Sequence, residues 1–185
     1  MNLLIIGSGA REHAFAWMIH NSKKDVNIFA TNPNAGMLDI VIALNIDIAN
    51  FNSVKESIIQ HSINLVLVGP EIPLIMGITD YITNHKDLNN VKVIGPSQLG
   101  AKLEGSKEFA KNFMKKYHIP TGSYRSFTKD SLNEGITFIK NSNPPYVLKA
   151  DGPAAGKGVI IVNNVKDAVS NLEDMLINSK FGASS

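Results

Sequence analysis

Leu3-Leu4-Ile5-Ile6-Gly7-Ser8-Gly9-Ala10-Arg11-Glu12 joins a short apolar run to a turn that contains two glycines. The residues that follow, from Glu12 to His20, have the composition of a helix. A buried strand, a glycine turn and a helix in this order are typical of the first unit of an open parallel sheet. The segment therefore predicts an α/β fold.

The same alternation continues over the first hundred residues. Apolar, β-branched runs at 26–30, 65–68 and 91–94 read as further strands that are buried on both faces, and 53–61 and 75–83 read as helices. Three of the four strands end at a turn: Gly7-Ser8-Gly9, Gly69-Pro70-Glu71 and Gly95-Pro96-Ser97. Because the carboxyl ends of parallel strands form the ligand crevice of such a sheet, these turns predict one small-molecule site.

The pattern changes after Leu103, which we take as a domain boundary between residues 1–103 and 104–185. An amphipathic helix is expected from Lys107 to Tyr117, with Phe109, Phe113 and Met114 on one side. Residues from about 120 to 185 then predict a small α/β flap subdomain. Its expected elements are a short strand at 124–127, a helix at 131–140, paired strands at 146–150 and 159–162, and a last helix at 165–178.

Composition narrows the class of protein. The 185 residues are 44% hydrophobic and 18% charged, with a net charge of +2 and no cysteine. These values are typical of a globular protein with a sizeable core, and the absence of cysteine excludes disulfides, thiolate metal sites and cysteine nucleophiles. We find no basic run that would bind nucleic acid and no apolar run of about 20 residues that would span a membrane. A cytoplasmic protein is expected.

A second glycine-rich segment, Asp151-Gly152-Pro153-Ala154-Ala155-Gly156-Lys157-Gly158, lies between two predicted strands. It is not a P-loop, because that motif has four residues between its glycines and a Ser or Thr after the lysine. A glycine turn between strands still lets backbone N–H groups approach phosphate oxygens, and Lys157 adds a positive charge. Taken alone, the same turn would equally suit a hairpin with a solvated lysine.

Two further lysines favour a phosphate site. Lys149 ends an apolar strand, where burial of an unpaired ammonium would be costly, so an anionic partner is expected. Lys107 begins a helix, and helix N-termini attract anions. Alone, Lys107 would be an ordinary surface residue and Lys149 could reach solvent along the strand end. Together they predict a triphosphate site made of Lys107, Lys149, Gly156, Lys157 and Gly158.

The first turn differs from a dinucleotide fingerprint, because Glu12 stands where the third glycine belongs. The second strand also lacks an acidic residue for a ribose hydroxyl, so a nicotinamide or flavin dinucleotide is disfavoured. The N–H groups of the turn, with Arg11 as a bidentate donor, would suit a monophosphate. Glu71 could accept from ribose hydroxyls or an amine, or could cap the next helix. The five histidines have no metal-ligand spacing, and Phe15 and Trp17 read as packing residues.

In this order along the chain, the motifs resemble the glycinamide ribonucleotide synthetase (phosphoribosylamine-glycine ligase) family of the ATP-grasp superfamily. The blocks that carry the resemblance are Gly7-Ser8-Gly9-Ala10-Arg11-Glu12-His13-Ala14, Asn34-Ala35-Gly36, Gly69-Pro70-Glu71 with Pro73-Leu74, Gly95-Pro96, Leu103-Glu104-Gly105-Ser106-Lys107, and Lys149-Ala150-Asp151-Gly152 through Gly156-Lys157-Gly158-Val159. They span nearly the whole chain. The resemblance implies a Rossmann-like pre-ATP-grasp domain followed by the start of an α+β ATP-grasp domain.

The resemblance also implies a reaction of purine synthesis, in which ATP, glycine and 5-phosphoribosylamine give glycinamide ribonucleotide, ADP and phosphate through glycyl phosphate. Lys149 and Lys157 would act catalytically by neutralising charge, with Mg²⁺ or Mn²⁺ as the metal. It implies ATP phosphates near Lys107, Lys149 and 156–158. The phosphoribosylamine would lie near Gly9, Ala10, Arg11, Asn34, Gly36 and Glu71.

The chain departs from the family pattern at Pro153, where Leu is usual, and at Asn32-Pro33-Asn34, where the family has Pro-Gly-Asn. Family members continue beyond Ser185 into the magnesium-binding residues, so we expect a truncated chain without full ligase activity and with no metal ligands of its own. Three alternatives remain: a sister ATP-grasp ligase of purine synthesis, a dinucleotide oxidoreductase, and a non-catalytic fragment that binds a phosphorylated sugar.

Overall fold

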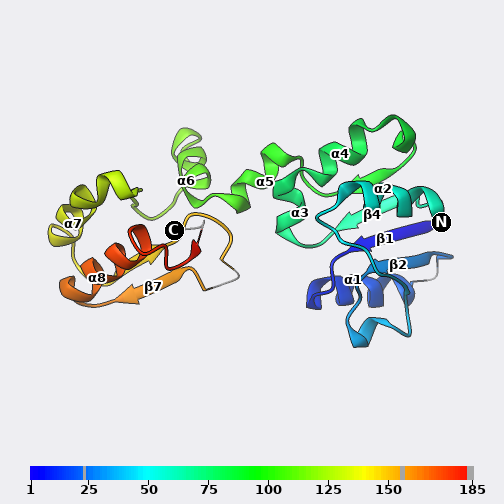
Figure 1. The fold of residues 1–185 in the computed structure, drawn as a ribbon, viewed down its shortest axis with the longest axis horizontal. Helices are drawn as coiled ribbons and strands as arrows, with labels where there is room; N and C mark the ends of the chain where they lie inside the picture. The colour runs from blue at the N-terminus through cyan, green and yellow to red at the C-terminus, as the bar shows by residue number, and fades with distance from the viewer. Residues whose placement is uncertain (23, 155–156, 183–185) are drawn as a thin grey trace. The chain divides into compact units, whose positions relative to one another are not determined.

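The computed structural model describes residues 1–22, 24–154 and 157–182. The chain divides into two compact units, Met1–Ala101 and Lys102–Ser185. In Figure 1 the first unit runs from blue to green and the second from green to red. The boundary that the sequence predicts after Leu103 falls inside a helix, α5 (Gln98–Gly105).

The first unit is built on a five-stranded sheet in the order β3-β2-β1-β4-β5, and all of its strand pairs are parallel. Its strands are β1 (Asn2–Ile6), β2 (Asn27–Thr31), β3 (Ile42–Leu44), β4 (Leu65–Val68) and β5 (Lys92–Ile94). Leu3 pairs with Ile28 on one side and with Leu65 on the other. The predicted parallel sheet is therefore confirmed, and its strand order reverses between β1 and β4.

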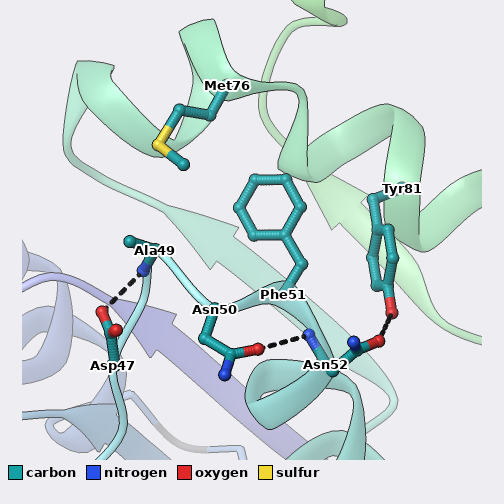
Figure 2. Close-up of a pocket in the computed structure, with 7 residues that line it drawn as sticks. All are labelled: Asp47, Ala49, Asn50, Phe51, Asn52, Met76 and Tyr81. Atoms are coloured by element: carbon teal, nitrogen blue, oxygen red, sulfur yellow. Dashed lines mark hydrogen bonds between the residues drawn. The ribbon is translucent and has the colours of Figure 1, made fainter.

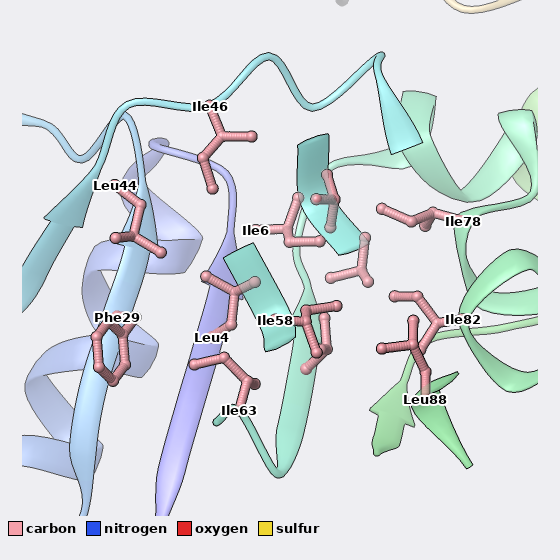
Figure 3. Close-up of a cluster of buried hydrophobic side chains, with 13 residues drawn as sticks. Leu4, Ile6, Phe29, Leu44, Ile46, Ile58, Ile63, Ile78, Ile82 and Leu88 are labelled. Carbon is pink, nitrogen blue, oxygen red and sulfur yellow. The ribbon is translucent and has the colours of Figure 1, made fainter. Parts of the chain in front are cut away.

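Two apolar layers cover the sheet because neighbouring residues of a strand face opposite sides. Leu4 and Ile6 point toward α2 (Phe51–Gln60) and α4 (Ile78–Asn84), in the cluster of buried side chains that Figure 3 draws. Leu3 and Ile5 pack with Ala16 of α1 (Ala10–His20) and with Met37 of the 3-10 turn η1 (Ala35–Met37). Burial on both faces explains the continuous apolar run that opens the sequence.

One predicted helix of the first unit is wrong in its extent. Residues 75–83 were expected to form a single helix, but the chain forms α3 (Glu71–Met76) and α4, which are separated by Gly77. Gly77 has φ 95°, a left-handed conformation that interrupts the helix and that glycine adopts at little steric cost. The last short element before β5 is the 3-10 turn η2 (Lys86–Leu88).

The second unit contains an antiparallel hairpin packed against helices. Its elements are α6 (Lys107–Lys116), the 3-10 turn η3 (Lys129–Ser131), α7 (Leu132–Lys140), β6 (Tyr146–Lys149), β7 (Val159–Val162) and α8 (Val165–Leu176). Tyr146 pairs with Val162 and Lys149 with Val159, which confirms the predicted strand pairing. Tyr146 and Leu148 face the core of this unit, whereas Val147 and Ile161 are exposed on the opposite face of the hairpin.

The strand expected at 124–127 does not form. These residues belong to an irregular segment that side chains of α6 hold in place. Lys111 Nζ donates to Thr121 Oγ1 at 2.7 Å and to the Gly122 carbonyl at 2.9 Å, and the Tyr124 hydroxyl donates to Asn112 Oδ1 at 2.7 Å. The aromatic residues of this segment therefore indicated side-chain packing, not a sheet ladder.

Candidate functional site

The turn after β1 is fixed by hydrogen bonds to protein oxygens. Gly7 has φ 117°, and its N–H donates to Oγ1 of the buried Thr31 on β2 at 2.9 Å. The N–H of Gly9 donates to Glu12 Oε2 at 2.6 Å. Two of the N–H groups on which a monophosphate site would rely are thus already engaged within the protein.

Glu12 is enclosed by three glycines. Its relative exposure is 4%, and a Cβ atom at Gly69 would lie 2.0 Å from its Oε1. A Cβ at Gly9 would lie 2.8 Å from Oε2, and one at Gly7 would lie 2.9 Å from Cγ. Oε1 is buried and has no hydrogen-bond partner among the residues that the structure describes. The glycines at the ends of β1 and β4 therefore leave room for this carboxylate.

The structure brings the predicted substrate residues together at the ends of β1, β2 and β4. Asn34 Nδ2 donates to the Ser8 carbonyl at 2.8 Å, and Asn34 Oδ1 accepts from Gly36 N–H at 3.0 Å. Arg11 Nη2 lies 3.7 Å from Glu71 Oε2, with both side chains largely or partly exposed. Such an exposed pair contributes little to stability, so both groups remain available to a ligand.

His13 lies beside this cluster, although the sequence analysis assigned it no binding role. A Cβ atom at Gly36 would lie 2.4 Å from His13 Cε1, so the ring packs directly on the glycine. His13 also lines an open hollow of about 330 Å³ on α1 with Ala10, Ala14 and Trp17. Trp17 is 60% exposed, which contradicts its expected role as a packing residue.

Another open hollow, of about 440 Å³, lies where β3 leads into α2 (Figure 2). Several of its polar groups are bonded to one another. Asp47 Oδ1 accepts from Ala49 N–H, Asn50 caps α2, and the Tyr81 hydroxyl donates to Asn52 Oδ1. Figure 2 also shows Phe51 and Met76 at its edge. The hollow contains none of the predicted site residues.

In the second unit, Lys107 contacts the beginning of the glycine-rich segment. Its Nζ donates to the Gly152 carbonyl at 3.0 Å and to the Asp151 carbonyl at 3.2 Å. The Asp151 carboxylate accepts from Glu108 N–H at 2.7 Å, and Ser106 Oγ accepts from Phe109 N–H at 3.0 Å. The N-terminus of α6 is therefore capped by protein oxygens, and Asp151 joins it to the end of β6.

The other predicted phosphate residues lie around the hairpin. Lys149 is exposed on the outer face of β6, so its ammonium reaches solvent at the strand end, and no buried charge requires the anionic partner that the sequence suggested. Lys157 is also exposed, and its N–H donates to the Ala154 carbonyl at 2.8 Å. Gly158 is buried, and its carbonyl accepts from Ala150 N–H at 2.8 Å. Gly156 lies outside the described residues, and the convergence of the lysines on one ligand stays a prediction.

Two negative findings concern only the part of the chain that the structure describes. Within it, no group of three or more His, Asp or Glu side chains could hold a metal ion. In those same residues, no helix has the length and apolar character that crossing a membrane would require.

Two family models match this chain and define its class. Residues 105–185 match the model of the phosphoribosylglycinamide synthetase ATP-grasp (A) domain, and residues 1–104 match that of the phosphoribosylglycinamide synthetase N domain. The fold is thus an α/β parallel-sheet domain joined to ATP-grasp sequence. Because the two models together cover the whole chain, the chain belongs to the phosphoribosylglycinamide synthetase family.

The similar proteins are longer than this chain. It is 41% identical over 182 residues to the phosphoribosylamine-glycine ligase of Halalkalibacterium halodurans, a match that covers 98% of the chain and 41% of that protein. It is 40% identical to the ligase of Neisseria meningitidis serogroup B, of which it covers 42%. The crystal structure of the Thermotoga maritima ligase superposes with a TM-score of 0.72 at 29% identity, over 99% of this chain and 41% of that one.

A more distant structural match shows the fold alone. The biotin carboxylase domain of the Hydrogenobacter thermophilus 2-oxoglutarate carboxylase, solved with MgADP and bicarbonate, has a TM-score of 0.68 at 17% identity. It covers 99% of this chain and 42% of that one. The parallel sheet followed by the hairpin unit is therefore an arrangement that proteins of different specificity share.

Proposed function

We propose that this chain belongs to an ATP-dependent carbon-nitrogen ligase that joins glycine to 5-phosphoribosylamine in de novo purine synthesis. A glycine carboxylate oxygen attacks the γ-phosphorus of ATP, and ADP leaves. The amine nitrogen of phosphoribosylamine then attacks the carbonyl carbon of glycyl phosphate, phosphate leaves with the bonding electrons, and the nitrogen loses a proton. Catalysis of this kind requires positioning and charge neutralisation and needs no side-chain nucleophile.

The first unit would bind phosphoribosylamine. Its supporting feature is the cluster of Gly9, Ala10, Arg11, Asn34, Gly36 and Glu71 at the ends of β1, β2 and β4. This edge of a parallel sheet, next to the reversal of strand order, is where such folds bind ligands. The Glu71 carboxylate would accept hydrogen bonds from ribose hydroxyls or the amine, and Arg11 would offer donors to an anionic group.

The second unit would bind the ATP phosphates through Lys107, Lys149, Gly156, Lys157 and Gly158. The observation that carries this proposal is the contact between Lys107 Nζ and the carbonyls of Asp151 and Gly152. This contact places Lys107 beside the glycine-rich segment, although the two are far apart in the sequence. A site for a polyanion would need such groups close together. Lys149 and Lys157 are exposed and can offer their charges to a ligand.

Mg²⁺ or Mn²⁺ bound with ATP would supply further neutralisation of the phosphate oxygens. The donors that we assign in this chain are lysine ammonium groups and backbone N–H groups, which bind phosphate and not metal. No metal ligand is proposed among the described residues. We propose a cytoplasmic protein whose ligands are small molecules.

Replacement of Lys149 by alanine should weaken binding of a non-hydrolysable ATP analogue about tenfold or more. A hydrogen bond to a charged group contributes about 1.5–3 kcal/mol, and 1.4 kcal/mol corresponds to a factor of ten. Lys157→Ala should act in the same direction. Isothermal titration calorimetry would measure the affinity, with Lys166→Ala, an exposed lysine of α8, as the control. Equal affinities of Lys149→Ala and Lys166→Ala would contradict the proposed role.

The 185 residues alone should bind glycinamide ribonucleotide and the ATP analogue without sustained turnover. The chain spans 41% of the length of the ligase from Halalkalibacterium halodurans, and its described part has no metal cluster. A coupled assay of ADP release with glycine and phosphoribosylamine should therefore remain at the background rate. Steady, glycine-dependent ADP release would overturn this expectation, and failure to bind either compound would overturn the proposed function itself.

A further inference from the structure

The buried carboxylate of Glu12 is the most unusual polar group of the first unit. Its side chain is 4% exposed, and its Oε1 has no hydrogen-bond partner among the described residues. Buried polar atoms of native proteins are nearly always hydrogen-bonded, so an unpaired carboxylate oxygen requires an explanation. The proposed ligase reaction does not use this residue.

Glu12 lies at the place where a phosphate would approach a glycine turn of this kind. It belongs to the first turn of α1, whose free N–H groups and dipole favour negative charge. Its Oε2 accepts from Gly9 N–H at 2.6 Å, which is the type of donor that such turns offer to phosphate. The carboxylate thus makes the contact that a ligand anion would make.

The surrounding glycines fit this carboxylate and not a ligand. Cβ atoms at Gly7, Gly9 and Gly69 would all lie within 3.0 Å of Glu12 side-chain atoms. Close approach of backbone to an anion is the usual reason for glycines in a phosphate-binding turn. Here the three glycines come close to a carboxylate that the chain itself provides.

We propose that Glu12 is the resident anion of the β1–α1 turn and that it closes this turn to phosphate groups. A phosphate placed at Gly9 would have to displace the carboxylate from its N–H donor or lie beside its negative charge. The turn is therefore a specificity device that excludes dinucleotides and inorganic phosphate.

The inference also restricts the pose of the proposed substrate, and for the substrate's identity it rests on the proposed function. The Gly7 and Gly9 N–H groups are engaged within the protein, so the Glu71 carboxylate is the acceptor for hydroxyl and amine donors and Arg11 is the donor left for an anionic group. The sugar-amine end of a phosphoribosylamine would face these groups. Its phosphate would be held elsewhere, away from Gly9.

The test begins with the unmodified chain. Amide ¹H–¹⁵N spectra are recorded during titration with inorganic phosphate, pyrophosphate and NAD, with chloride at equal ionic strength as the reference. The Gly7 and Gly9 resonances should show no saturable shift. A saturable shift of Gly9 with phosphate would overturn the inference, whether or not the chain binds glycinamide ribonucleotide.

Variants then test whether removal of the carboxylate opens the turn. In Glu12→Ala, phosphate and acetate should raise the thermal unfolding midpoint and shift the Gly9 amide, because either anion can occupy the vacated position. Glu12→Gln fills the same space and should not respond. Glu134→Ala, which removes an exposed acidic residue from the first turn of α7, is the matched control.

The responses of these variants to phosphate and acetate can support or contradict the role of Glu12. A response of Glu12→Ala no larger than that of Glu134→Ala would contradict the inference. If Glu12→Ala does not fold, folded Glu12→Gln and the unmodified chain still decide it, because saturable phosphate binding at Gly9 in either one would be contrary to the proposal. If the unmodified chain does not bind glycinamide ribonucleotide, that result would count against the proposed function and not against the role of Glu12.

Discussion

Gly69→Ala should lower the free energy of unfolding of the first unit by about 1–3 kcal/mol, the usual cost of overpacking a close-packed site. The new Cβ atom would lie 2.0 Å from Glu12 Oε1 and 2.5 Å from its Cδ. The carboxylate cannot move aside easily, because Gly7 and Gly9 enclose it from other directions. Urea unfolding at equilibrium would measure the loss.

Two further variants show whether the clash with Glu12 is the cause. In a Glu12→Ala background the Gly69→Ala substitution should cost less, with a coupling of about 0.5–3 kcal/mol in the double-mutant cycle. Gly122→Ala is the matched control, because a Cβ there would have nothing within 4 Å, and its effect should stay within about 0.5 kcal/mol. Strict additivity of the Glu12 and Gly69 changes would show that the two residues do not meet.

Asp151→Ala should both destabilise the second unit and weaken binding of the ATP analogue. The loss of the hydrogen bond from Glu108 N–H, 2.7 Å long in the native chain, removes a cap of α6 and should cost about 1–2 kcal/mol. Alanine keeps the backbone carbonyls of residues 151 and 152 that accept from Lys107 Nζ, but without the carboxylate the N-terminus of α6 is no longer tied to this segment, so the Lys107 contacts should weaken as well. We expect an affinity loss of about tenfold.

A cap elsewhere in the same unit separates the two effects. Asn164 caps α8 by accepting from Asp167 N–H at 2.8 Å, so Asn164→Ala should cost similar stability and leave nucleotide affinity unchanged. Asp151→Asn keeps an acceptor for Glu108 N–H and should recover most of the affinity. If Asp151→Ala and Asn164→Ala bind the ATP analogue equally well, Asp151 has only a structural role.

The central strands of the first unit could be predicted because burial on both faces leaves a clear signal. The expectation of such burial is wrong for β5, which is exposed at Lys92 and Ile94. Leu3 to Ile6 are at most 1% exposed, and such a run has few alternatives to a central parallel strand. β3 was not predicted, since Ile42-Ala43-Leu44 is short, lies at the edge of the sheet and is half exposed at Ile42. Edge strands carry a weaker apolar pattern than central ones.

The positions of the candidate site residues in the fold were predicted in part for the same kind of reason. Glycine, proline and charged residues at strand ends are visible in sequence, so Gly9, Arg11 and Glu71 could be placed at one edge of the sheet. The roles of Glu12 and Asp151 depend on contacts with distant segments, which no local pattern contains. The sequence did contain a signal for Glu12. This acidic residue follows the turn with Gly7 and Gly9 after β1, and the neighbouring strand β4 is also followed by a glycine, Gly69.

The all-parallel connection of the first sheet also has a consequence for how the chain folds. β1 pairs with parallel strands, and a tight hairpin joins only antiparallel ones. Leu3 must therefore pair with Ile28 and Leu65, which lie far from it in the sequence. Closing such long loops costs chain entropy before any ladder forms, which slows folding. The β6–β7 hairpin needs only a short closure, so after dilution from denaturant the carboxyl-terminal half should gain its native contacts first and the amino-terminal half last.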